Sequence, residues 1–133
     1  MERNKEILEI LKTKKKFYLE NNVSDETKIN RDCSIIVALI EGRILSSKFT
    51  HNGDIVIRYD FSTNCVLYYP KLMDNINDTL ECMMGILVSN DKCKFMLEKH
   101  INNYLLKNGT QYGIKIMEII NHERITVRVI VND

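Results

Sequence analysis

The chain has 133 residues, of which 44% are hydrophobic, so it is long enough to bury one core. Its 19 basic and 18 acidic residues give a formal net charge of +1. This balance excludes a strong overall field that would draw the protein to nucleic acid, anionic lipid or an acidic substrate. Because the chain has only five Gly and one Pro, we expect no linker or disordered tail and a single compact domain over residues 1–133.

The sequence predicts a cytoplasmic protein. The charged first residues are not followed by the apolar stretch of a secretory signal, and the longest apolar run, residues 35–40, is too short to cross a bilayer. In a reducing compartment we expect the four cysteines to remain thiols: Cys33, Cys65, Cys82 and Cys93. The heavy use of Ile, Asn and Lys is typical of AT-rich genomes, including those of several virus groups.

The first part of the chain predicts two helices. Residues 2–20 carry a narrow apolar stripe, with acidic residues near the start and lysines near the end, an order that suits the helix dipole. Residues 25–48 repeat apolar side chains every three or four positions behind Ser24, a suitable N-cap. A buried strand over residues 34–40 is the alternative, because Ile and Val favour strands.

The middle of the chain predicts a hairpin followed by two helices. Residues 54–69 alternate apolar and polar side chains, and Pro70 ends the second strand because proline cannot donate to the ladder. Residues 71–107 return to helical spacing, with an interruption at residues 89–91 and a left-handed stop at Gly109. The first strand of the hairpin is expected to place four residues on one face: Ile55, Ile57, Tyr59 and Phe61.

A second hairpin is predicted over residues 114–131, with its turn at residues 121–124. Its expected core face carries Ile114, Ile116, Ile120, Ile125, Val127, Val129 and Val131. Apolar residues also fall on the other face, although a thin sheet needs only one apolar face for its own core. We interpret this surplus, with two residues of the first hairpin, as a partner-binding surface: Val66, Tyr68, Met117, Ile119 and Ile130.

These elements predict an α+β domain with the order αα-ββ-αα-ββ, in which antiparallel ribbons pack against helices. In element order this resembles the small subunits of vesicle-tethering complexes and the small-ligand-binding domains related to them. The resemblance implies an adaptor or a ligand-binding domain.

No pattern in the sequence predicts a catalytic, cofactor or metal site. The cysteines form no C-x-x-C pair, and the three histidines lie in separate elements. His51 with Asp54, or His122 with Glu123, could be drawn as a base and its orienting acid, but both pairs lie in predicted turns. The chain has no glycine-rich phosphate loop. We therefore expect neither an enzyme nor a bound cofactor or metal.

The leading hypothesis is a small non-enzymatic protein-interaction or regulatory module, either a homo-oligomer or a subunit of an assembly. The alternative is a nucleic-acid-binding regulator that uses the basic end of the first helix: Lys12, Lys14, Lys15 and Lys16. Lysines at a helix C-terminus also complement the helix dipole, so we expect any nucleic-acid binding by this cluster to be weak. A small-ligand-binding domain or tethering-complex-like adaptor is a further alternative.

Overall fold

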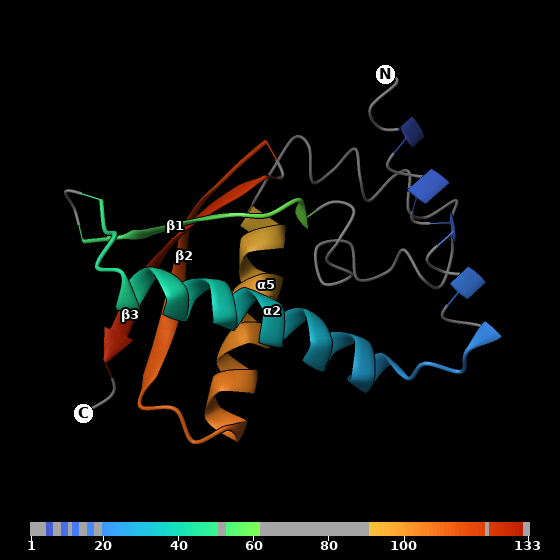
Figure 1. Cartoon of the computed structure of the whole chain (residues 1–133), viewed down its shortest axis with the longest axis horizontal. Helices are drawn as coiled ribbons and strands as arrows, with labels where there is room; N and C mark the ends of the chain where they lie inside the picture. Colours follow the sequence, from blue (N-terminus) through green and yellow to red (C-terminus); the bar gives the residue numbers. More distant parts are fainter. Residues whose placement is uncertain are drawn as a thin grey trace.

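The structure is a computed structural model that describes residues 5–6, 9–10, 12–13, 16–17, 20–50, 53–61, 91–121 and 123–131 (Figure 1). Its elements in chain order are α2 (Asp25–Leu45), β1 (Ile55–Arg58), α5 (Asp91–Lys107), β2 (Tyr112–Ile120) and β3 (Arg124–Val131). The strands form an antiparallel sheet in the order β1-β3-β2. The expected α+β class is therefore confirmed.

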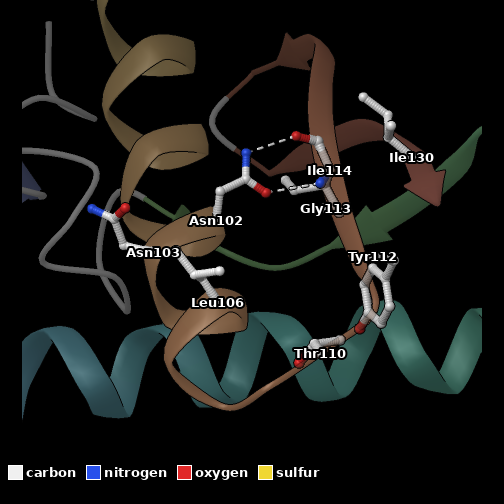
Figure 2. Close-up of a pocket in the computed structure, with 8 residues that line it drawn as sticks. All are labelled: Asn102, Asn103, Leu106, Thr110, Tyr112, Gly113, Ile114 and Ile130. Atoms are coloured by element: carbon white, nitrogen blue, oxygen red, sulfur yellow. Dashed lines mark hydrogen bonds between the residues drawn. The ribbon is translucent and has the colours of Figure 1, made fainter. Parts of the chain in front are cut away.

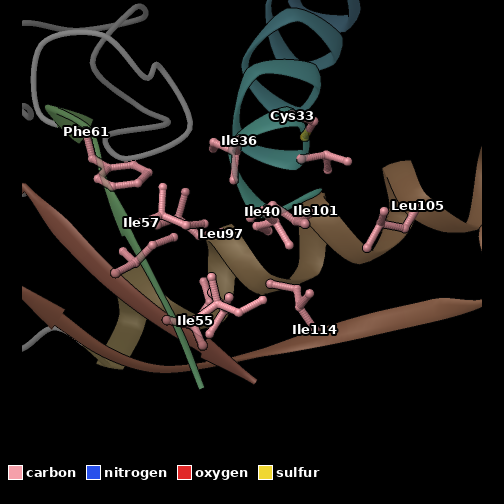
Figure 3. Packing of buried hydrophobic residues seen from close by; sticks show 14 of the residues in the cluster. Cys33, Ile36, Ile40, Ile55, Ile57, Phe61, Leu97, Ile101, Leu105 and Ile114 are labelled. Carbon is pink, nitrogen blue, oxygen red and sulfur yellow. The ribbon is translucent and has the colours of Figure 1, made fainter. Parts of the chain in front are cut away.

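The core lies between one face of this sheet and the two helices. Ile55 and Ile57 of β1 and Ile125 and Val127 of β3 are buried on that inner face. Figure 3 shows these strands packed against α2 and α5, whose buried side chains complete a single cluster. The helical contributions include Cys33, Ile36, Ile40, Leu97, Ile101 and Leu105.

Helix α2 settles the choice between helix and strand for residues 34–40 in favour of the helix. Ser24 caps it, since the Thr27 N–H donates to Ser24 Oγ at 3.2 Å. The helix ends at Leu45, three residues before the predicted end. It ends there because Ser47 takes a left-handed φ of 53° and the N–H groups of Ser47 and Lys48 bond back to the last turn.

The predicted first hairpin needs correction. Strand β1 ends at Arg58. Phe61 has a helical and not an extended conformation, although its ring is fully buried. The rings of Tyr59 and Phe61 meet edge to face with centroids 5.4 Å apart. Strand β1 also pairs with β3, with Ile55 opposite Val127, so the two predicted ribbons contribute to one sheet.

Helix α5 confirms the predicted fourth helix and its stop. Gly109 has a φ of 69°, the Gly109 N–H donates to the Leu106 carbonyl at 3.1 Å, and the Thr110 N–H donates to the Leu105 carbonyl at 3.0 Å. This pair of bonds is the Schellman ending that an Asn-Gly step favours. Phe95 and Leu106 lie off the buried stripe and are exposed.

A β-bulge corrects the predicted faces of the second hairpin. The register between β2 and β3 shifts between Ile116 and Glu118, which inserts one extra residue into β2. Because side chains alternate along a strand, the extra residue turns Ile119 inward, where it is 4% exposed. The prediction that Ile119 lies on the outer face is therefore wrong, and Ile120 does not take the core position predicted for it.

Polar side chains of α5 close the free edge of β2. The Asn102 amide donates to the Ile114 carbonyl at 2.9 Å and accepts from the Ile114 N–H at 2.8 Å. The Glu98 carboxylate accepts from the Ile116 N–H at 2.8 Å. The helix therefore supplies hydrogen bonds that another strand would otherwise make.

The remaining predicted elements are covered only in part. Every described residue between 5 and 20 is helical, in agreement with a first helix there. The second strand of the first hairpin and the third helix lie outside the described residues, so the order αα-ββ-αα-ββ stays a prediction. None of the helices in the described ranges has the length and hydropathy of a membrane-spanning segment.

Candidate functional site

The structure does not gather the predicted partner-binding residues into one surface. Ile119 is in the core, Met117 is half-buried at the bulge, and Ile130 is 46% exposed on the outer face. Ile130 pairs with Gly113, four residues from Met117, so the two are roughly 13 Å apart along the sheet. Val66 and Tyr68 lie outside the described residues.

The lysine cluster of the first helix is partly paired. Lys12 Nζ lies 3.3 Å from Glu9 Oε1, and Lys16 Nζ lies 4.0 Å from Glu20 Oε1. These exposed pairs add little stability, but each carboxylate reduces the positive charge offered to a phosphate. Lys14 and Lys15 lie outside the described residues.

Apolar side chains are instead exposed where α2 ends beside the strands. They line an open groove of about 420 Å³. Its walls are formed by Ile44, Leu45, Tyr112, Val129 and Val131, together with the polar residues Glu41 and Gln111. Leu45 is 86% exposed and Val131 is 71% exposed. We call this groove the end groove.

Tyr112 forms the boundary of the end groove and bonds to α2. Its hydroxyl donates to Glu41 Oε1 at 3.0 Å. Burial, followed by the hydrogen bond to Glu41 and the charge of that carboxylate, raises the pKa of Tyr112 to about 12. The phenol therefore stays protonated at neutral pH and holds β2 to the side of α2.

A second hollow of about 320 Å³ adjoins the end groove and shares Tyr112 with it (Figure 2). Leu106 and Ile130 contribute exposed apolar surface to this hollow. Its Gly113 is closely packed, since a Cβ there would lie 3.2 Å from Asn102 Oδ1. Exposed apolar side chains from α2, α5 and β3 thus surround one end of the domain.

Cys33, the described cysteine with a placed side chain, is a core residue. It is fully buried, and its thiol donates to the His100 carbonyl at 3.6 Å. Burial and then the neighbouring Asp32 charge raise the pKa of Cys33 to about 12. A protonated thiol is a poor nucleophile and a poor metal ligand. Among the residues that the structure describes, no group of three His, Cys, Asp or Glu side chains is placed to hold a metal.

Sequence reasoning missed the end groove. Val131 was predicted to lie in the core, because it continues the period-2 pattern of the strand. It is exposed instead, because it is the last residue of β3. Leu45 lies off the apolar stripe of α2 at the last helical residue. An apolar residue at the last position of a helix and off the helix's apolar stripe, such as Leu45, is the signal that could have found this groove.

Comparisons with protein-family models, with curated proteins and with solved structures each find no match to this chain.

Proposed function

We propose that the chain is a non-enzymatic protein-interaction module that self-associates through the end groove. The observation that carries this proposal is the exposure of Leu45 of α2 and Val131 of β3, which both line one apolar groove. Scattered apolar residues are normal on a surface, but a contiguous set typically marks an interaction site.

The magnitudes favour a weak, reversible dimer. Burial of a Leu or Val side chain is worth about 1.5–3 kcal/mol, so two such residues from each of two copies contribute roughly 6–12 kcal/mol. Association costs about 4–15 kcal/mol in lost translational and rotational freedom. We therefore expect a dissociation constant in the micromolar range.

Charge does not oppose this association. The formal net charge is +1, so two copies meet without strong mutual repulsion. The groove itself contains one acid, Glu41, whose carboxylate accepts the Tyr112 hydroxyl. A second copy can therefore bury the apolar walls without leaving that carboxylate unpaired.

Light scattering and sedimentation across a concentration series test the proposal. The wild-type chain is expected to dimerise at micromolar concentrations, and Leu45→Glu is expected to remain monomeric because a carboxylate cannot be buried unpaired in the groove. Leu45 is 86% exposed in the monomer, so this variant should fold.

Phe95→Glu is the matched control. Phe95 is 67% exposed on α5 but lines neither the end groove nor the hollow beside it. This variant is expected to dimerise like the wild type. A wild-type chain that stays monomeric to high micromolar concentration, or a Phe95→Glu variant as monomeric as Leu45→Glu, would contradict the proposal.

A further inference from the structure

Another open hollow, of about 360 Å³, lies over the outer face of the sheet, and four cations are among its lining residues. Arg43 and Lys48 come from the end of α2 and the segment after it, Arg58 from β1 and Arg124 from β3. Phe49, which is 46% exposed, adds an aromatic ring to the lining. No carboxylate is among the described lining residues, and none of these residues lines the end groove. We call this the basic hollow.

Two of the three arginines of the basic hollow, Arg58 and Arg124, lie directly opposite each other on neighbouring strands. Arg58 pairs with Arg124 in the register of β1 and β3, and both side chains point to the outer face. Like charges directly opposite on neighbouring strands destabilise a sheet. Within the described ranges neither guanidinium makes an ion pair or a side-chain hydrogen bond, although Asp60 and Glu123 border the adjoining hollow.

The other two cations have a structural explanation that the arginine pair lacks. Arg43 lies in the last turn of α2 and Lys48 just beyond it, where cations complement the helix dipole. Nothing in the described part of the chain favours these two guanidinium groups side by side, because no ion pair or side-chain hydrogen bond is found for either of them there. Each carries five N–H donors, in a planar arrangement that matches a phosphate group.

We propose that the basic hollow binds single-stranded nucleic acid, with a backbone phosphate between Arg58 and Arg124 and a neighbouring base stacked on Phe49. A phosphate accepts hydrogen bonds from both guanidinium groups and removes the repulsion between them. A base stacks on an exposed aromatic ring whatever its identity, so the site is expected to show little sequence preference.

The hollow suits a single strand better than a duplex. Its volume falls in the lower part of the range for small-ligand sites, about 300–1,000 Å³, which admits one phosphate together with an adjacent base. In a duplex the bases are already stacked on each other, so Phe49 would have no face to contact.

Fluorescence anisotropy with a labelled oligothymidylate single strand, over a series of salt concentrations, tests the proposal. Arg58→Gln and Arg124→Gln should each weaken binding and lower the slope of log affinity against log salt by about 0.7. Phe49→Ala should weaken binding about fivefold to a hundredfold and leave the slope unchanged, because it removes stacking and not charge. Unlabelled inorganic phosphate should compete only weakly.

Lys115→Gln is the matched control for charge. Lys115 is exposed on the same outer face, opposite Arg128 and outside the basic hollow. Its loss removes the same formal charge and should leave the affinity within about twofold, as expected when that charge makes no phosphate contact. Equal losses in Lys115→Gln and Arg58→Gln, tighter binding to a duplex of the same length, or unchanged binding by Phe49→Ala would each overturn the proposal.

A thermal melt distinguishes a binding role from a structural one. If Arg58 and Arg124 are present for binding, Arg58→Gln relieves their repulsion and should keep or raise the melting temperature. A variant that binds less and melts at the same or a higher temperature supports the proposal. A clear fall in melting temperature would mean that the arginine pair holds the fold together, and would overturn it.

Discussion

The two faces of the sheet are built from the same strands but carry different side chains. The inner face consists of isoleucine and valine side chains that α2 and α5 cover. The outer face carries four cations, Arg58, Lys115, Arg124 and Arg128, against two carboxylates, Glu118 of β2 and Asp54, which directly precedes β1. One of those carboxylates is already used, because Asp54 Oδ1 accepts from Arg128 Nε at 2.9 Å. The hydrophobic core therefore lies against one face, and the other face carries an excess of cations among the described residues.

The same carboxylate is expected to have very different effects on the two faces. Ile119→Asp buries a charge at a position that is 4% exposed. It is expected to lower the free energy of unfolding by several kcal/mol, so that most molecules are unfolded. Ile130→Asp, at a position that is 46% exposed, should cost less than about 1 kcal/mol. Circular dichroism with urea denaturation measures both, and comparable losses would refute the assignment of faces.

The next largest effect is expected at the edge where the two faces meet. Asn102→Ala removes both hydrogen bonds to Ile114 and leaves a partly buried N–H and carbonyl without partners. We expect a loss of about 2–4 kcal/mol in the free energy of unfolding. Asn103→Ala, one exposed position along α5, should stay within about 0.5 kcal/mol of the wild type. A neutral Asn102→Ala would show that the edge does not depend on α5.

A smaller effect, a gain in the free energy of unfolding, is expected in the segment that follows α2 and leads to the basic hollow. Ser47 has a φ of 53°, a left-handed conformation that glycine adopts more easily. Ser47→Gly is expected to stabilise the chain by about 1 kcal/mol. The equivalent position after α5 is already Gly109, so Gly109→Ala should destabilise by a similar amount. Denaturant titrations of the two variants should therefore shift in opposite directions.

The smallest effect is confined to alkaline solution, at the margin of the inner face. Because the pKa of Tyr112 is raised to about 12 in the folded chain, above its ordinary value of 10.0, unfolding releases a proton once the pH passes 10. The stability that Tyr112 contributes is thus present below pH 10 and lost as the pH rises toward 12. Thermal melts of Tyr112→Phe should fall less steeply across that window. Parallel curves for the two proteins would rule out this coupling.

Local features of the fold could be predicted from the sequence. Three- and four-residue spacing predicted α2 and α5, and Asn108-Gly109 predicted the end of α5, because helix spacing and caps depend on neighbours in the chain. The turn before β3 was predicted on the same basis. The end of α2 was predicted three residues late, since a serine gives no strong signal for a left-handed residue.

Features that depend on distant parts of the chain could not be predicted. No residue near position 117 predicts the bulge, yet the bulge determines whether Ile119 faces the core or the solvent. The pairing of β1 with β3 joins residues about seventy positions apart, and the arginine pair exists only because of it. Neither candidate surface could therefore be predicted without knowing the register of the strands.

Closure of the β2 edge by Asn102 and Glu98 limits how the domain can combine with other chains. Free strand edges recruit other strands, which is the route to edge-to-edge aggregation and to binding by strand addition. Here the outward N–H groups of Ile114 and Ile116 are already bonded to α5. An incoming strand would first have to displace that helix from the edge. Copies of this chain that meet on the β2 side must therefore associate through side chains, without lengthening the sheet.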